Sequence, residues 1–254
     1  MPRLITADDT METGVIPGLA GYNFSAVRVD RLGASEYTLV TIAVDISGSV
    51  GNFRDDLVQS VRNSVASCRK SPKAGNILLR VVTFNHNLVE VHGFKPLTEI
   101  DEAIYDTIHT GGGTALYDAA STSVGAMVEF GRRLAAQDYG VNGVIFIITD
   151  GDDQNSKFGA SAVRQKVDEA VNGEVLESCL TILIGVNAKQ YKQRLEDFQR
   201  GAGITAYEDV GDANPNNLAK MASFISRSVS SQANAQGTGV SAQVVAGGSA
   251  SIII

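Results

Sequence analysis

Four short apolar segments constrain the fold of this chain more than any other feature of its sequence. They are nearly continuous runs rich in β-branched residues, which is typical of parallel strands buried on both faces of a sheet. The four segments are Tyr37–Val44, Ile77–Phe84, Gly143–Thr149 and Leu180–Val186. Leu88–His92 alternates apolar and polar residues instead, so we expect an antiparallel strand toward the sheet edge. Ile204–Asp209 gives a sixth strand.

Helical patterns separate these strands. Apolar residues three or four positions apart form one buried stripe in each pattern. The stripes are Phe53, Leu57, Val61 and Val65; Leu116, Ala120, Val124, Met127 and Val128; Val163, Val167 and Val171; Leu195 and Phe198; and Leu218, Met221, Ala222, Ile225 and Val229. The alternation of strands and helices predicts an α/β fold, doubly wound, with a mostly parallel six-stranded sheet and one antiparallel edge strand.

The chain of 254 residues fits one such domain with extensions at both ends. We expect the domain over residues 37–230 and an N-terminal arm over residues 1–36. Within that arm, Tyr22–Leu32 has a strand-like alternation, which predicts an arm lying on the domain. Residues 231–254 are expected to form a low-complexity tail.

The tail is unusual because no charged side chain occurs from Ser228 to Ile254. One interpretation is a low-complexity linker. The other is an assembly arm, in which Val240–Val245 and Ser249–Ile254 add strands to another subunit and produce a homo-oligomer. The sequence leaves both interpretations open.

Five side-chain oxygens follow the first and third of the four apolar strands or lie in a glycine-rich loop between them. They belong to Asp45, Ser47, Ser49, Thr114 and Asp150. Ligands of open α/β sheets bind outside the carboxyl ends of the strands, where Asp45 and Asp150 both fall. A set of hard oxygens without Cys or His suits Mg²⁺, with Mn²⁺ or Ca²⁺ as alternatives, and argues against zinc or copper.

Each of these residues also has a purely structural interpretation. Asp45 fits a turn after a strand, Ser47 and Ser49 fit helix caps, and Asp150 fits a simple turn with the glycine after it. Their combination with a glycine loop favours the metal site. Asp152 and Asp153 are interpreted separately, as a solvated acidic rim.

Three segments carry a family resemblance. Asp45–Ser49, Gly112–Thr114 and Thr149–Gly151 resemble the three parts of the metal-ion-dependent adhesion site of von Willebrand factor type A domains, in that family's order. The resemblance covers roughly Tyr37 to Val229. Within the family, the chain is most similar to the bacterial or phage members that are stand-alone cytoplasmic proteins. It implies a Rossmann-like doubly wound fold, a bound Mg²⁺, Mn²⁺ or Ca²⁺ ion, and protein ligands rather than turnover.

The function expected first is therefore a metal-dependent protein–protein interaction, in which an Asp or Glu of the partner binds the ion. The alternative, also implied by the resemblance, is an adaptor or regulator of a MoxR-type AAA+ ATPase or of a stress or tellurium-resistance system. An enzyme is not expected. Ser47 stands where a phosphatase of the Asp-x-Asp kind has its second acid, nucleotide-binding glycine motifs are absent, and His86, His92 and His109 are too scattered for a triad.

Composition excludes further classes. A net charge of −7 without a Lys and Arg cluster argues against nucleic-acid binding. The start of the chain lacks the apolar core of a signal peptide, and no segment approaches the ~18 apolar residues that span a bilayer. Cys68 and Cys179 are expected to be reduced, buried thiols, which predicts a cytoplasmic location.

Overall fold

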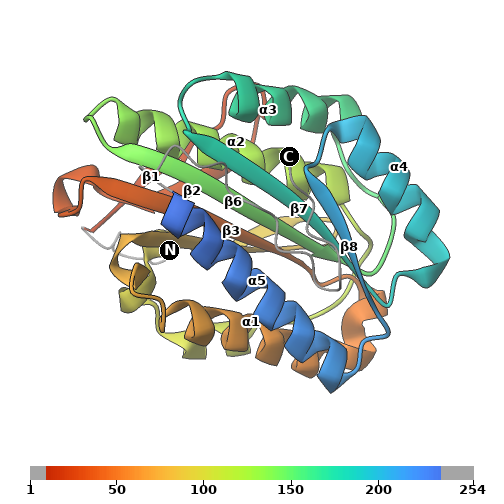
Figure 1. Ribbon diagram of the computed structural model, residues 1–254. Helices are drawn as coiled ribbons and strands as arrows, with labels where there is room; N and C mark the ends of the chain where they lie inside the picture. Colours follow the sequence, from red (N-terminus) through yellow and green to blue (C-terminus); the bar gives the residue numbers. More distant parts are fainter. Residues whose placement is uncertain (1–9, 236–254) are drawn as a thin grey trace, which may run out of the picture.

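A central sheet with helices on both faces makes up the described part of the chain, residues 10–235, in a computed structural model (Figure 1). Eight strands form the sheet in this part, in the order β1-β2-β5-β4-β3-β6-β7-β8. Their bounds are β1 Met11–Val15, β2 Asn23–Val27, β3 Glu36–Asp45, β4 Ile77–Phe84, β5 Leu88–Pro96, β6 Gly140–Thr149, β7 Ser178–Val186 and β8 Ala206–Gly211.

The helices divide into two layers. Helices α2, α3 and α4 cover one face of the sheet, and α1 and α5 cover the other (Figure 1). Their bounds are α1 Arg54–Cys68, α2 Leu116–Ala135, α3 Ala160–Asn172, α4 Lys192–Ala202 and α5 Pro215–Ala235. None of the helices in the described part is long and apolar enough to cross a membrane.

Strand β3 shows why its sequence is almost continuously apolar. It pairs in parallel with β4 on one side and with β6 on the other. Leu39 and Ala43 point into the core beneath α2, whereas Val40, Ile42 and Val44 point into the core beneath α1 and α5. Both faces of β3 are therefore buried, as the parallel arrangement requires.

The doubly wound α/β class and all six predicted strands are confirmed, but the sheet has two more strands than predicted. Strand β1 pairs antiparallel with β2, and β2 joins β5 in parallel at Ala26 and Phe94. The Leu88–His92 strand is therefore interior, and β1 is the antiparallel strand at the edge. Gly93 permits this junction, because a Cβ there would lie 2.1 Å from the carbonyl oxygen of Ser25.

The predicted apolar stripes all fall on helical segments, but one of their residues is exposed rather than buried. Val171 is 59% exposed, whereas the buried stripe of α3 contains Val163, Val167 and Ala170. A helix has 3.6 residues per turn, so the strict spacing of four from Val163 to Val171 drifts out of the buried stripe.

Helix α5 continues to Ala235, five residues into the segment predicted to be a tail. Its buried Gln232 donates from Nε2 to the carbonyl oxygen of Gly143 at 3.0 Å and to Ser178 Oγ at 2.7 Å. In return, Asn142 Nδ2 donates to the Gln232 carbonyl oxygen at 2.9 Å. The end of α5 is therefore fixed to the first residues of β6 and β7. Assembly through Val240–Val245 and Ser249–Ile254 lies outside the described residues and stays a prediction.

This anchoring predicts that Gln232→Ala lowers the free energy of unfolding by about 1–2 kcal/mol, because it leaves buried acceptors unpaired. Gln193→Ala is the matched control, since Gln193 also bonds a neighbour, Asp197, but on the exposed face of α4. Chemical denaturation should show a change within about 0.5 kcal/mol for the control. Equal effects in the two variants would contradict the anchoring.

Candidate metal centre

The candidate site lies at the carboxyl ends of β3 and β6, which are neighbours in the sheet. Asp45 is the last residue of β3, and Asp150 follows Thr149, the last residue of β6. The register pairs Val44 with Ile148, so the next residues, Asp45 and Thr149, also lie side by side. Thr149 Oγ1 donates to Asp45 Oδ2 at 2.6 Å, which fixes one carboxylate oxygen.

The turn after β3 brings two hydroxyls to the same place. Asp45 Oδ1 accepts the backbone N–H of Ser47 at 2.8 Å, an Asx-type turn that the residue type favours. Ser47 Oγ and Ser49 Oγ lie 3.1 Å apart, and Ser49 Oγ donates to Asp150 Oδ1 at 3.0 Å. Hydrogen bonds therefore connect four of the five predicted ligand residues within one cluster.

Thr114, the fifth predicted residue, follows a glycine loop that is bonded to the serine turn. The N–H of Gly48 donates to the Gly112 carbonyl oxygen at 2.9 Å, which joins the glycine loop to the serine turn. Gly112 has φ +83, and a Cβ there would lie 2.2 Å from His86 Nδ1, so glycine is required. Thr114 itself is 3% exposed.

The two carboxylates carry uncompensated charge. Asp45 is 1% exposed and Asp150 is 7% exposed, and no basic side chain among residues 10–235 pairs with either. Burial, together with a smaller effect from the charge of Asp150, raises the pKa of Asp45 to about 6, although hydrogen bonds from Thr149 and Ser47 act in the opposite direction. Burial also raises the pKa of Asp150. Buried anions without a counter-charge favour a cation between them.

The donor chemistry fits a hard divalent cation. Asp45, Ser47, Ser49, Thr114 and Asp150 would hold it, and their oxygens suit Mg²⁺ or Mn²⁺. Hydroxyls make up three of these five donors. Within the described ranges, no group of three or more His, Cys, Asp or Glu is placed to bind a metal. Ser49 is exposed, which leaves the cluster open to solvent on that side.

The site depends on two residues that sequence reasoning missed. Thr149 orients Asp45, and a hydroxyl directly before Asp150 was the available signal. The other is Asn85, which donates from Nδ2 to the Gly111 carbonyl oxygen at 2.6 Å. Its own carbonyl oxygen accepts the N–H of Ala115 at 2.6 Å, so Asn85 holds both ends of the glycine loop. Nothing in a single sequence indicates that pairing.

The interpretation of Asp152 and Asp153 as a solvated rim was wrong. Asp153 Oδ1 accepts the N–H of Tyr117 at 3.2 Å in the first turn of α2, where a negative charge is favoured by the helix dipole. Asp152 forms an ion pair with Arg194 at 2.7 Å. Both carboxylates therefore have structural partners.

The three histidines lie in different environments. The ring of His86 lies against Gly112 in the glycine loop. His92 is buried, and its Nε2 lies 3.0 Å from the Tyr105 hydroxyl. His109 is exposed.

Comparison with protein-family models finds no match, and comparison with curated proteins finds none either. Several solved structures are similar in fold. The pilus adhesin SpaC from Lactobacillus rhamnosus GG has a TM-score of 0.60 and 10% identity over 82% of this chain and 31% of that chain. A D319A mutant of the PilB minor pilin from Streptococcus sanguinis has a TM-score of 0.55 and 16% identity over 83% and 65%. A von Willebrand factor type A protein from Catenulispora acidiphila has a TM-score of 0.55 and 12% identity over 82% and 45%.

These similarities establish a von Willebrand factor A-like fold. The chain spans between 31% and 65% of the length of these three structures.

The thiols Cys68 and Cys179 are free and buried, as predicted, and burial raises the pKa of each to about 12.

The buried charge of Asp45 predicts that Asp45→Asn stabilises the metal-free protein at about pH 7.5, by up to about 3 kcal/mol for a pKa raised from 3.8 to about 6. The folded state binds this proton more tightly than the unfolded chain does. Lowering the pH toward about 4 should therefore stabilise the wild type relative to the variant and remove the difference.

Thermal or chemical unfolding in EDTA at a series of pH values measures this effect. Asn keeps an acceptor for the Ser47 N–H, so the turn is preserved. A variant that is less stable than the wild type by the same amount at every pH would contradict the assignment of a destabilising charge to Asp45.

Proposed function

We propose that this protein is a metal-dependent protein-binding module. A Mg²⁺-type ion is held by Asp45, Ser47, Ser49, Thr114 and Asp150, and an Asp or Glu of a partner protein binds to it. The observation that carries the proposal is the pair of buried carboxylates without a counter-charge. They lie at the carboxyl ends of β3 and β6 and are connected through two serine hydroxyls.

The donor set explains why the partner group would be a carboxylate. When bound, the ion supplies positive charge and open coordination positions. Only Asp45 and Asp150 bring negative charge, since the hydroxyls are neutral, so an additional carboxylate is tolerated. Hard divalent cations prefer such oxygen ligands and rarely accept many protein carboxylates directly.

The surface around the site gives a partner room to approach. The exposed Ser49 lies in the short helical turn Gly48–Phe53, and a hollow of about 470 Å³ adjoins this turn. Gly51–Asp56 and Thr110 line the hollow. The similarity in fold to a pilus adhesin and a minor pilin supports an interaction role. We also propose a cytoplasmic location, because Cys68 and Cys179 are free thiols.

The proposal predicts that Mg²⁺ or Mn²⁺ raises the melting temperature of the wild type and not that of Asp150→Asn. A ligand that binds only the folded state stabilises it by mass action, by about 2.7 kcal/mol at one hundred times its Kd. Asp152→Asn is the matched control, two positions away, because Asp152 pairs with Arg194 rather than with the cluster. Calorimetry with and without EDTA would refute the site if Asp150→Asn responded to metal as the control does.

A partner should be retained only in the presence of the ion. We expect immobilised wild-type protein to capture a protein from its native host in Mg²⁺ and to release it in EDTA, and immobilised Asp45→Asn to capture none. Mass spectrometry identifies the partner, and replacing its contacting Asp or Glu by Asn or Gln should remove capture. Capture that persists in EDTA at the same level would contradict a metal-dependent interaction.

The proposal includes no turnover. We assign no nucleophile or base to the five oxygens, and the nearby His86 lies against the glycine loop. Hydrolysis of a phosphate ester or peptide that requires metal and disappears in Asp45→Asn would overturn this part of the proposal.

A further inference from the structure

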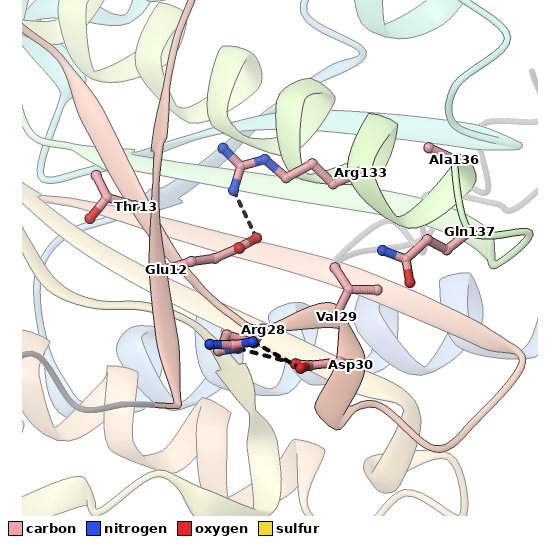
Figure 2. A pocket seen from close by; sticks show the side chains of 8 residues that line it. All are labelled: Glu12, Thr13, Arg28, Val29, Asp30, Arg133, Ala136 and Gln137. Carbon is pink, nitrogen blue, oxygen red and sulfur yellow. Dashed lines mark hydrogen bonds and ion pairs between the residues drawn. The ribbon is translucent and has the colours of Figure 1, made fainter.

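Residues 11–27, which we call the N-terminal segment, lie along helix α2. Near the last turn of α2, Arg133 forms an ion pair with Glu12 of β1 at 2.8 Å (Figure 2). The Arg133 guanidinium also lies over the Phe24 ring at 5.3 Å. In the middle of the helix, Gly125 permits close contact with Ile16, because a Cβ there would lie 2.5 Å from the Ile16 Cγ2. The segment is therefore held against α2 over much of the helix.

At the first turn of α2 the same segment reaches a buried carboxylate. Tyr22 donates its hydroxyl to Asp118 Oδ2 at 2.7 Å. Asp118 is 1% exposed, and no basic side chain in the described residues pairs with it. Its other donors are the backbone N–H groups of Lys157 at 3.0 Å and Phe158 at 2.9 Å. Asp118 therefore joins the N-terminal segment to the loop that contains these two residues.

That loop, Gly151–Gly159, follows the candidate ligand Asp150, and we call it the strap. The N–H groups of Gln154 and Asn155 in the strap donate to the carbonyl oxygen of Thr114 at 2.8 and 2.9 Å. The strap is thus bonded to a candidate ligand residue in its middle and to Asp118 near its end. This short piece of backbone therefore connects Asp118 with Thr114.

We propose that Tyr22 is a positioning residue, and that the N-terminal segment is a brace that fixes the strap and, through it, Thr114. The inference rests on the proposed function for its effect on metal affinity. The physical reason is that a buried carboxylate is stabilised by the donors around it, and hydrogen bonds to charged groups are the stronger ones. Without the Tyr22 hydroxyl, the Asp118 carboxylate is less well satisfied in its buried position and holds the strap less firmly.

The test compares Tyr22→Phe with Tyr37→Phe in the full chain. Tyr22→Phe removes the hydroxyl and keeps the ring, which contacts Phe158 at 6.2 Å between centroids. Tyr37 is the matched control, since its hydroxyl accepts the N–H of Ala34 at 2.9 Å near the start of β3, at the opposite end of the strand from Asp45.

Two quantities are measured for each variant. The first is hydrogen exchange at the Gln154 and Asn155 amides in EDTA, and the second is Mg²⁺ affinity by calorimetric titration. Tyr22→Phe should lower amide protection about tenfold, the factor equivalent to ~1.4 kcal/mol. It should also weaken Mg²⁺ binding several-fold. Tyr37→Phe should change neither the amide protection nor the Mg²⁺ affinity, even if it lowers the stability of the protein as much as Tyr22→Phe does.

Unchanged protection in Tyr22→Phe would overturn the brace. Reduced protection with unchanged Mg²⁺ affinity would overturn the positioning of Thr114. If the wild type binds no Mg²⁺, the proposed function fails, but the exchange measurement in EDTA still decides whether Tyr22 fixes the strap.

Discussion

Two carboxylates, Asp45 and Asp150, are buried at the carboxyl ends of adjacent parallel strands, and the surrounding structure is arranged around their charge. A buried anion is costly unless hydrogen bonds or a counter-charge stabilise it. Here Thr149, the Ser47 N–H and the Ser49 hydroxyl supply hydrogen bonds, and no basic side chain among residues 10–235 supplies a charge. The folded protein therefore retains an electrostatic requirement that a hard cation would satisfy.

Backbone contacts bring the separate parts of the site together. The N–H of Ile46 donates to the Phe84 carbonyl oxygen at 2.8 Å, and the N–H of Gly111 donates to the Ile46 carbonyl oxygen at 2.8 Å. The strap adds its bonds to Thr114 on the other side. These contacts join segments far apart in the chain, so a site built from neutral hydroxyls and only two acids is still held in one geometry.

Periodicity predicted most of the fold, because parallel strands and amphipathic helices have direct sequence signals. It predicted six strands and five helices, and it placed Asp45 and Asp150 at the carboxyl ends of their strands. The two N-terminal strands were missed as members of the sheet, since β2 joins β5 at a single residue pair and depends on Gly93 beside Ser25. Contacts such as Asn85 with Gly111 and Tyr22 with Asp118 are tertiary pairings, which no local pattern indicates.

The most direct measurement of the central claim is anomalous diffraction at the manganese edge from crystals grown with Mn²⁺. We predict one strong peak at the carboxyl ends of β3 and β6, at bonding distance from the hydroxyl oxygens of Ser47 and Ser49. Crystals of the Asp45→Asn variant, grown under the same conditions, should show no peak at this position. A wild-type structure with ordered Asp45 and Asp150 side chains and no peak between them, at millimolar Mn²⁺, would contradict the account.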